Sequence, residues 1–156
     1  MTKKYELLKD DTKVNDFGVT LYRIRALVAV GSLAVPGQLG GYIEKESNLS
    51  HKENAWVYGD AWVYGDARVS GDARVSSRTS WLLIGPAKSS GRFTTAFKDS
   101  KVGVRVVCGC FSGTVEEFSK QIETTHKDNK EYLEQYRLFC QLIGFNFGLD
   151  NKQGEI

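Results

Sequence analysis

Small apolar residues recur at a fixed period of six between residues 55 and 78. The segments AWVYGD, AWVYGD, ARVSGD and ARVSSR follow one another without interruption. In each segment an Ala and a Val stand two positions apart, so both side chains point to the same side of an extended strand. The Gly-Asp pair that ends the first three segments is typical of a turn. The pattern therefore predicts short strands separated by corners, with Ala and Val in the interior.

This hexapeptide pattern resembles that of left-handed parallel β-helices, in which an aliphatic residue is followed four positions later by a small one. In that family three hexads complete one triangular coil. Ile43 and Leu49 continue the period weakly upstream, in GGYIEKESNLSHKEN. The resemblance implies about two coils over residues 43–78.

Two such coils would stack positions 18 residues apart. Trp56 would then lie over Arg74, and Val57 over Val75. The first pair could form a cation–π contact of about 0.5–1 kcal/mol at an exposed position.

The segments on either side of the repeat have different patterns. Upstream, KYELLK and TLYRIRAL read as strands, with Pro-Gly and Gly-Gly pairs before the repeat. Downstream, strands are expected at 81–84, 93–97 and 102–107. Two helices follow: one begins at a capping box formed by Thr114 and Glu117, and the other covers about 129–143 and ends at Gly144.

The expected fold is mainly β: a short left-handed parallel β-helix with a β-rich N-terminal cap and a small C-terminal α+β module. The corresponding division of the chain is 1–42 for the cap, 43–80 for the repeats, 81–144 for the α+β module and 145–156 for a tail.

Composition places the chain among folded, soluble proteins. Of its 156 residues, 41% are hydrophobic and 26% are charged, which argues against global disorder. The formal net charge of +2 gives no support to nucleic-acid binding. No apolar segment is long enough to span a bilayer, and three cysteines suit a reducing compartment. A cytoplasmic protein without a membrane partner is expected.

A wider resemblance covers residues 3–143. The runs LGGYIE and NLS before the hexads, and CGCFSGT after them, are similar to a group of phage and prophage β-helix proteins that are often labelled transferase-like. The resemblance implies a mobile-element setting in a bacterial host cell. It implies no catalytic residues.

The aromatic residues of the repeat predict a surface for assembly. Two coils bury little by themselves, and repeat units of this kind associate to cover their faces. A homotrimer is the expected state, because triangular prisms of this family commonly assemble around a threefold axis. Arg78 and two further arginines of the repeat could hold a small anion or a nucleotide, although a solvated face explains them as well. The predicted assembly or binding residues are Trp56, Tyr58, Trp62, Tyr64, Arg68 and Arg74.

Metal binding is a weak alternative. Cys108 and Cys110 would project from one face of a strand and could ligate zinc together with His126 or Cys140. A Cys-x-Cys near a strand end with one nearby histidine is more often explained by packing. No metal and no cofactor are therefore expected, and the repeated glycines indicate corners rather than a phosphate loop.

The small number of histidines argues against an enzyme. Hexapeptide acyltransferases use a histidine as general base, and this chain has only His51 and His126. His51 falls at an inward position, where a structural role is the simpler interpretation. We therefore expect a non-enzymatic binding protein that engages or inhibits a host defence factor through its repeat or C-terminal module. An acyltransferase that uses His51 and a structural or virion component are the alternatives.

Overall fold

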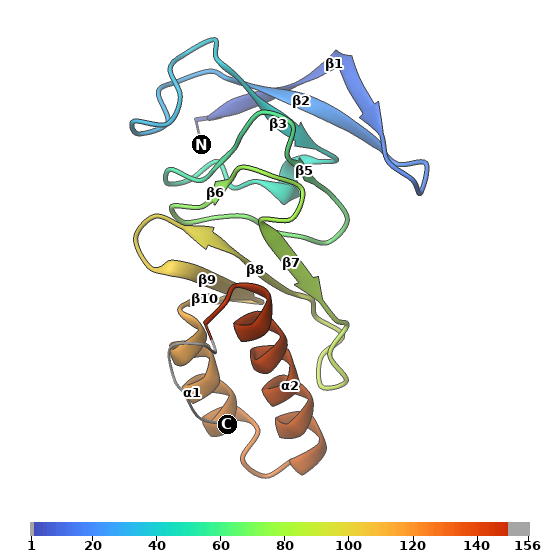
Figure 1. Cartoon of the computed structure of the whole chain (residues 1–156), viewed down its shortest axis with the longest axis vertical. Coiled ribbons are helices and arrows are strands. Elements are labelled where there is room, and N and C mark those ends of the chain that lie inside the picture. The colour runs from blue at the N-terminus through green and yellow to red at the C-terminus, as the bar shows by residue number, and fades with distance from the viewer. Residues whose placement is uncertain (1, 150–156) are drawn as a thin grey trace.

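The computed structural model describes residues 2–149 as a column of three parts (Figure 1). N-terminal strands lie at one end, the hexapeptide segment lies in the middle, and a second sheet with two helices forms the other end. The elements in chain order are β1 (Tyr5–Val14), β2 (Thr20–Ala26), β3 (Leu39–Ile43), the 3-10 helix η1 (Glu46–Asn48), β4 (Trp56–Val57), β5 (Trp62–Val63), β6 (Arg74–Val75), β7 (Trp81–Ile84), β8 (Thr94–Asp99), β9 (Gly103–Cys108), β10 (Phe111–Gly113), α1 (Val115–Thr125) and α2 (Lys130–Asn146).

The N-terminal strands form a mixed sheet of order β1-β2-β3-β5. β1 and β2 are antiparallel, as are β2 and β3, whereas β3 and β5 are parallel. The strands expected from KYELLK and TLYRIRAL are confirmed as β1 and β2. The N-terminal strands therefore share one sheet with the repeat through the β3–β5 pair.

The interior of the hexapeptide segment is as the period predicted. Its corner glycines Gly59, Gly65 and Gly71 all have positive φ, which marks the turns. Trp56 pairs with Arg74, and Val57 with Val75, in parallel register. The inward side chains, each at most 1% exposed, are Ala55, Val57, Ala61, Val63, Ala67, Val69, Ala73 and Val75.

Upstream of residue 55 the expected register is wrong. Ile43 pairs with Val63, and Leu49 bridges to Val69, so these partners are 20 residues apart rather than 18. The offset is 20 on both sides of η1, so the two extra residues lie between Leu49 and Trp56, where Glu53 adopts a positive φ of 58°. The six-residue period consequently does not extend without interruption to residue 43.

The expected fold class is also wrong. Strands contain 35% of the residues and helices 21%, and no left-handed parallel β-helix is evident in residues 2–149. The parallel pairs β3–β5 and β4–β6 join only two residues on each strand, whereas the longer strands pair antiparallel. The four hexads are too few to form a β-helix of their own. Strands from both flanks complete the sheets around them. The structure is a mixed α and β fold built on several small sheets.

A pair of glycines sets the distance between β3 and the repeat. A Cβ on Gly40 would lie 2.6 Å from the Val57 carbonyl oxygen and from a side-chain carbon of Ile24. A Cβ on Gly41 would lie 2.7 Å from the Ala61 carbonyl oxygen. Only glycine allows this approach, because any other residue would displace backbone atoms of the repeat.

The C-terminal sheet is antiparallel, with the order β10-β9-β8-β7. Its three longer strands are close to the expected ranges, and β10 was not predicted. The capping box at the start of α1 is confirmed: the Thr114 hydroxyl accepts from the Glu117 N–H, and the Glu117 carboxylate accepts from the Thr114 N–H. α2 continues past Gly144, where it was expected to end, because the following turn packs Phe147 against the helical core.

Both faces of the C-terminal sheet are buried. Phe97 and Val107 belong to the core of the hexapeptide segment, which we call the repeat core. Ala96, Val104 and Val106 belong to the core beneath α1 and α2, which we call the helical core. One sheet thus joins the two cores.

Within residues 2–149, neither α1 nor α2 is long and apolar enough to cross a membrane.

Of the predicted tail, Phe145 and Asn146 belong to α2. Residues 150–156 lie outside the described part of the chain. The proposed boundaries at 42, 80 and 144 stay predictions.

Candidate functional site

The predicted assembly surface does not form one exposed aromatic patch. Trp56 was expected to point outward, but it is 0% exposed, so this prediction is wrong. The reason is that β1 covers this strand and places Tyr5 against the indole at a ring-centroid distance of 6.5 Å. Trp56 is part of the repeat core rather than of a partner site.

The other aromatic residues of the repeat are half-buried by contacts within the chain. Arg78 lies 3.5 Å from the centre of the Trp62 ring, and the Trp81 indole N–H donates to the Trp62 carbonyl at 2.7 Å. Tyr64 packs edge-on against Trp81 at 5.5 Å. Burial raises the pKa of Tyr58, which nearby Arg74 partly offsets. These contacts leave less aromatic surface for a partner than the sequence indicated.

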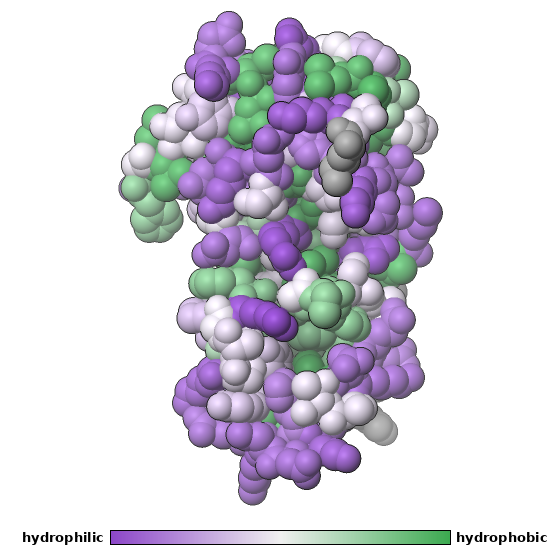
Figure 2. Space-filling view, turned by 180° about the vertical axis from the view of Figure 1, so that it is seen from behind, coloured by the Kyte–Doolittle hydropathy of each residue, from purple (hydrophilic) through white to green (hydrophobic). Residues whose placement is uncertain are grey.

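Exposed apolar side chains gather elsewhere, around the N-terminal strands. Figure 2 shows hydrophobic residues on the upper part of the molecule, over the end where β1 and β2 lie. Phe17 is 82% exposed, and Val35 is 64% exposed. Neither was singled out from the sequence.

The arginines of the repeat diverge to three places. Arg68 donates to the Gly109 carbonyl at 2.6 Å. Arg74 lines a cavity beside the end of β8, and Arg78 lies on Trp62. The structure therefore does not bring Arg68, Arg74 and Arg78 together into one groove.

His51 is held through both of its ring nitrogens and one face of its ring. Its Nδ1 accepts the Lys4 backbone N–H at 3.0 Å, and its Nε2 lies 3.1 Å from a carboxylate oxygen of Glu46. The ring stacks on Tyr5 at 4.1 Å. Because Nδ1 already accepts a hydrogen bond, this imidazole is placed as a structural bridge rather than as an available general base.

The cysteines and the second histidine converge. β9 and β10 are joined by a two-residue turn, in which Gly109 has φ of 59° and Cys108 pairs with Phe111. This turn brings the half-buried Cys108 and the exposed Cys110 to the mouth of a cavity of about 390 Å³. We call it the CGC pocket. His126 lies on the opposite wall, at the C-terminal end of α1.

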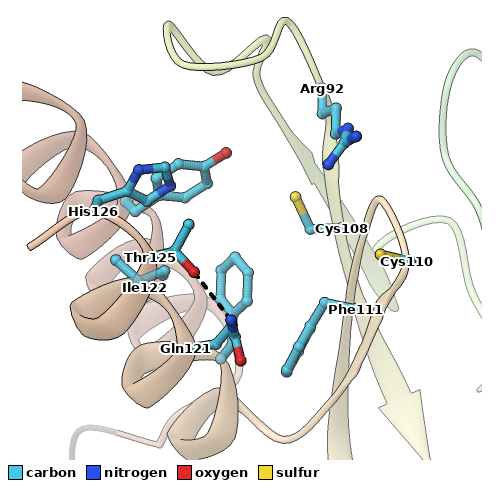
Figure 3. A pocket seen from close by; sticks show the side chains of 10 residues that line it. Arg92, Cys108, Cys110, Phe111, Gln121, Ile122, Thr125 and His126 are labelled. Carbon is cyan, nitrogen blue, oxygen red and sulfur yellow. Dashed lines mark hydrogen bonds between the residues drawn. The ribbon is translucent and has the colours of Figure 1, made fainter.

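The CGC pocket has an apolar floor and a polar rim. Phe111, Phe118 and Ile122 form the floor. Figure 3 shows the α1 side chains on one side, and opposite them Cys108 at the end of β9, Cys110 in the turn after it and Arg92 in the loop before β8. The Gln121 amide donates to the Thr125 hydroxyl at 3.0 Å, and the His126 ring stacks on Tyr136 at 5.0 Å.

Positive charge surrounds the CGC turn. The Arg92 guanidinium lies against Gly109, since a Cβ on that glycine would meet Arg92 Nη1 at 2.8 Å. Arg68 binds the carbonyl of the same glycine. Among residues 2–149, Arg92 makes no ion pair, and no carboxylate lines the CGC pocket. The rim therefore carries a positive charge that no carboxylate of the described lining offsets.

Within residues 2–149, no hydrogen bond joins Cys108 or Cys110 to His126. In the described part of the chain, no group of three or more His, Cys, Asp or Glu side chains is placed to hold a metal ion. Cys140 lies on α2, outside the pocket lining, and burial raises the pKa of its thiol to about 11. A cysteine nucleophile needs a base within hydrogen-bond reach.

Sequence reasoning missed Arg92, Gln121 and Tyr136. Arg92 stands in the irregular loop before β8, where no period points to it. Gln121 and Tyr136 belong to predicted helices, and only the packing of α1 against α2 and the CGC turn brings them to one pocket.

Comparison with known proteins finds no matching family model, no matching curated protein and no matching solved structure. The resemblance to phage and prophage proteins therefore stays a prediction from the residues.

Proposed function

We propose that this chain is a non-enzymatic binding protein of phage or prophage origin, which acts in the cytoplasm of a bacterial host. Its C-terminal module holds a small organic anion with a planar apolar body in the CGC pocket. By binding this molecule, the protein would withhold it from a host factor and thereby inhibit a host defence.

The observation that carries this proposal is the combination of cavity size, floor and rim. A volume of about 390 Å³ suits one small organic molecule. The floor of Phe111, Phe118 and Ile122 would cover a flat ring, and the unpaired Arg92 would meet its negative charge. Such a pocket offers binding groups without an assembled nucleophile and base.

The two alternative functions have less support. An acyltransferase would need His51 as a base, but Lys4 and Glu46 engage both of its ring nitrogens. A filament or virion component would need uncovered repeat ends, but the hexapeptide segment lies between the N-terminal strands and β7–β10 (Figure 1).

The test compares two probes with the same ring system, indole-3-acetate and its neutral counterpart indole-3-ethanol. Binding is followed by amide chemical shifts and by calorimetry. We expect the anion to bind about tenfold more tightly, because a hydrogen bond to a charged group contributes about 1.5–3 kcal/mol. The shifts should centre on residues 108–111.

Arg92→Gln should abolish the preference for the anion, while Arg78→Gln, a change to an exposed arginine outside the pocket, should preserve it. Equal affinity for both probes in the unmodified protein, or the absence of binding at millimolar concentration, would overturn the proposal.

The homotrimer also stays a prediction, and the burial of Trp56 removes part of its basis. Light scattering of the purified protein at micromolar concentration decides it: a mass of one chain contradicts self-association.

A further inference from the structure

A second cavity lies at the opposite end of β8 and β9 from the CGC pocket. Its volume is about 460 Å³. One wall is the loop 76–80, which follows the last hexad, and the other is the turn between β8 and β9. We call it the serine basin, because Ser76, Ser77, Ser80 and Ser100 line it together with Thr79.

Two cations of the serine basin lack a partner. Arg74 on β6 and Lys98 on β8 are both exposed and line the cavity. Neither makes an ion pair within residues 2–149, whereas neighbouring Lys101 pairs with Asp72 at 3.2 Å. Two strands that are far apart in the sequence thus place positive charge at the same hollow.

Asp99, the only carboxylate that residues 2–149 contribute to the basin lining, already accepts hydrogen bonds at both oxygens. Its Oδ2 accepts from Arg105 Nε at 2.7 Å and from the Asp72 N–H at 3.0 Å. Its Oδ1 accepts from the N–H groups of Lys101 and Val102 at 2.8 and 3.1 Å. Burial alone would raise the pKa of Asp99, but Arg105 and these backbone donors outweigh it and lower the pKa. Asp99 therefore neither attracts a metal cation nor cancels the two free cations.

The hydroxyl groups supply donors that can rotate toward a ligand. Ser77 Oγ lies 2.8 Å from Ser80 Oγ and 3.3 Å from Thr79 Oγ1. Ser80 Oγ accepts the Ser77 N–H at 2.9 Å, which anchors the loop. Each hydroxyl can donate one hydrogen bond. Several such hydroxyls beside two cations suit a tetrahedral oxyanion, which has more acceptor oxygens than a carboxylate.

We propose that the serine basin binds the phosphoryl group of a small phosphorylated molecule. Arg74 and Lys98 neutralise its charge, and the hydroxyls of the loop 76–80 bind its oxygens. A nucleic acid is the less suitable occupant, because a net charge of +2 gives little long-range attraction for a polyanion. This site is independent of the organic anion proposed for the CGC pocket.

Calorimetric titration with glycerol 3-phosphate tests the proposal, with glycerol as the neutral probe. Glycerol 3-phosphate should bind and glycerol should not. Arg74→Gln and Lys98→Gln should each weaken binding about tenfold or more, which corresponds to the loss of one charge-assisted hydrogen bond. Thr79→Val, which keeps the shape and removes one hydroxyl, should weaken it by a smaller factor.

Matched controls separate this site from general positive charge and from the CGC pocket. Lys101→Gln and Arg78→Gln remove nearby exposed cations outside the basin lining and should leave the affinity unchanged. Arg92→Gln should also leave it unchanged, so failure at one pocket does not imply failure at the other. Equal loss in the three basin variants and in the three controls would identify unspecific charge, and the absence of binding by the unmodified protein would refute the site.

Discussion

Lys4 shows how one side chain joins the N-terminus to the repeat. It is 4% exposed, and its ammonium group donates to the Ala55 carbonyl at 2.7 Å and approaches those of Lys52 and Glu53 at 3.5 Å. Burial lowers the pKa of Lys4 to about 8, and Glu53 only partly offsets this. A buried ammonium group held by carbonyls ties β1 to the loop before β4.

The lowered pKa of Lys4 predicts how stability depends on pH. Between about pH 8 and pH 10.5 the unfolded chain binds a proton that the folded protein has lost. The contribution of Lys4 to the free energy of unfolding should therefore rise with pH in this window. In urea denaturation across it, the free energy of unfolding of the unmodified protein and of Lys52→Met should rise relative to that of Lys4→Met. Parallel pH profiles for Lys4→Met and the unmodified protein would contradict this role.

Single residues also show where sequence reasoning stops. The Ala and Val positions of the hexads could be predicted because a period of six repeats the same environment. The burial of Trp56 could not, because it depends on β1, which is about 50 residues away and carries no trace of the period. The cysteines and His126 were singled out for their chemistry, but Arg92 became visible only through the fold.

Among the elements, α1 has the clearest local cause. Thr114 and Glu117 satisfy each other's backbone N–H groups at its start. Such a cap needs only four residues, which is why it could be predicted. The register upstream of β4 could not, because the loop between Leu49 and Trp56, in which Glu53 has a positive φ, contains two extra residues that no six-residue pattern encodes.

Removal of the cap should have a measurable cost. Thr114→Ala should lower the free energy of unfolding by about 1 kcal/mol, since the Glu117 N–H loses its acceptor. Thr124→Ala, on the exposed side of the same helix, is the matched control and should cost less. Urea denaturation measures both, and an equal loss for the two variants would show that the cap adds nothing.

For the whole molecule, the central feature is the sheet β7–β10, which contributes to both cores. Phe97 faces the repeat core, and its neighbour Ala96 faces the helical core. Unfolding of either core would expose one face of this sheet, so the two are coupled. The expected left-handed β-helix was wrong at this scale. That prediction considered the repeat alone and not the flanking strands that complete its sheets.

This coupling predicts a single unfolding transition. Trp56 belongs to the repeat core, and Trp81 packs against it and forms a hydrogen bond with Trp62. Both helices instead cover the helical core. Tryptophan fluorescence therefore reports on the middle of the column, and helical circular dichroism reports on its helical end. Their urea curves should coincide. Two separate midpoints would mean that the cores unfold independently.

The glycine pair of β3 has a consequence for inheritance. At Gly40 and Gly41 every mutation adds at least a Cβ that meets backbone oxygens within 2.7 Å, whereas nothing lies within 4 Å of such an atom at Gly59 or Gly65. Descendants of this gene can thus alter the corners of the repeat at the cost of local backbone strain alone. They cannot replace either glycine of the pair without moving β3 away from the repeat, so selection should preserve glycine longest at these two positions.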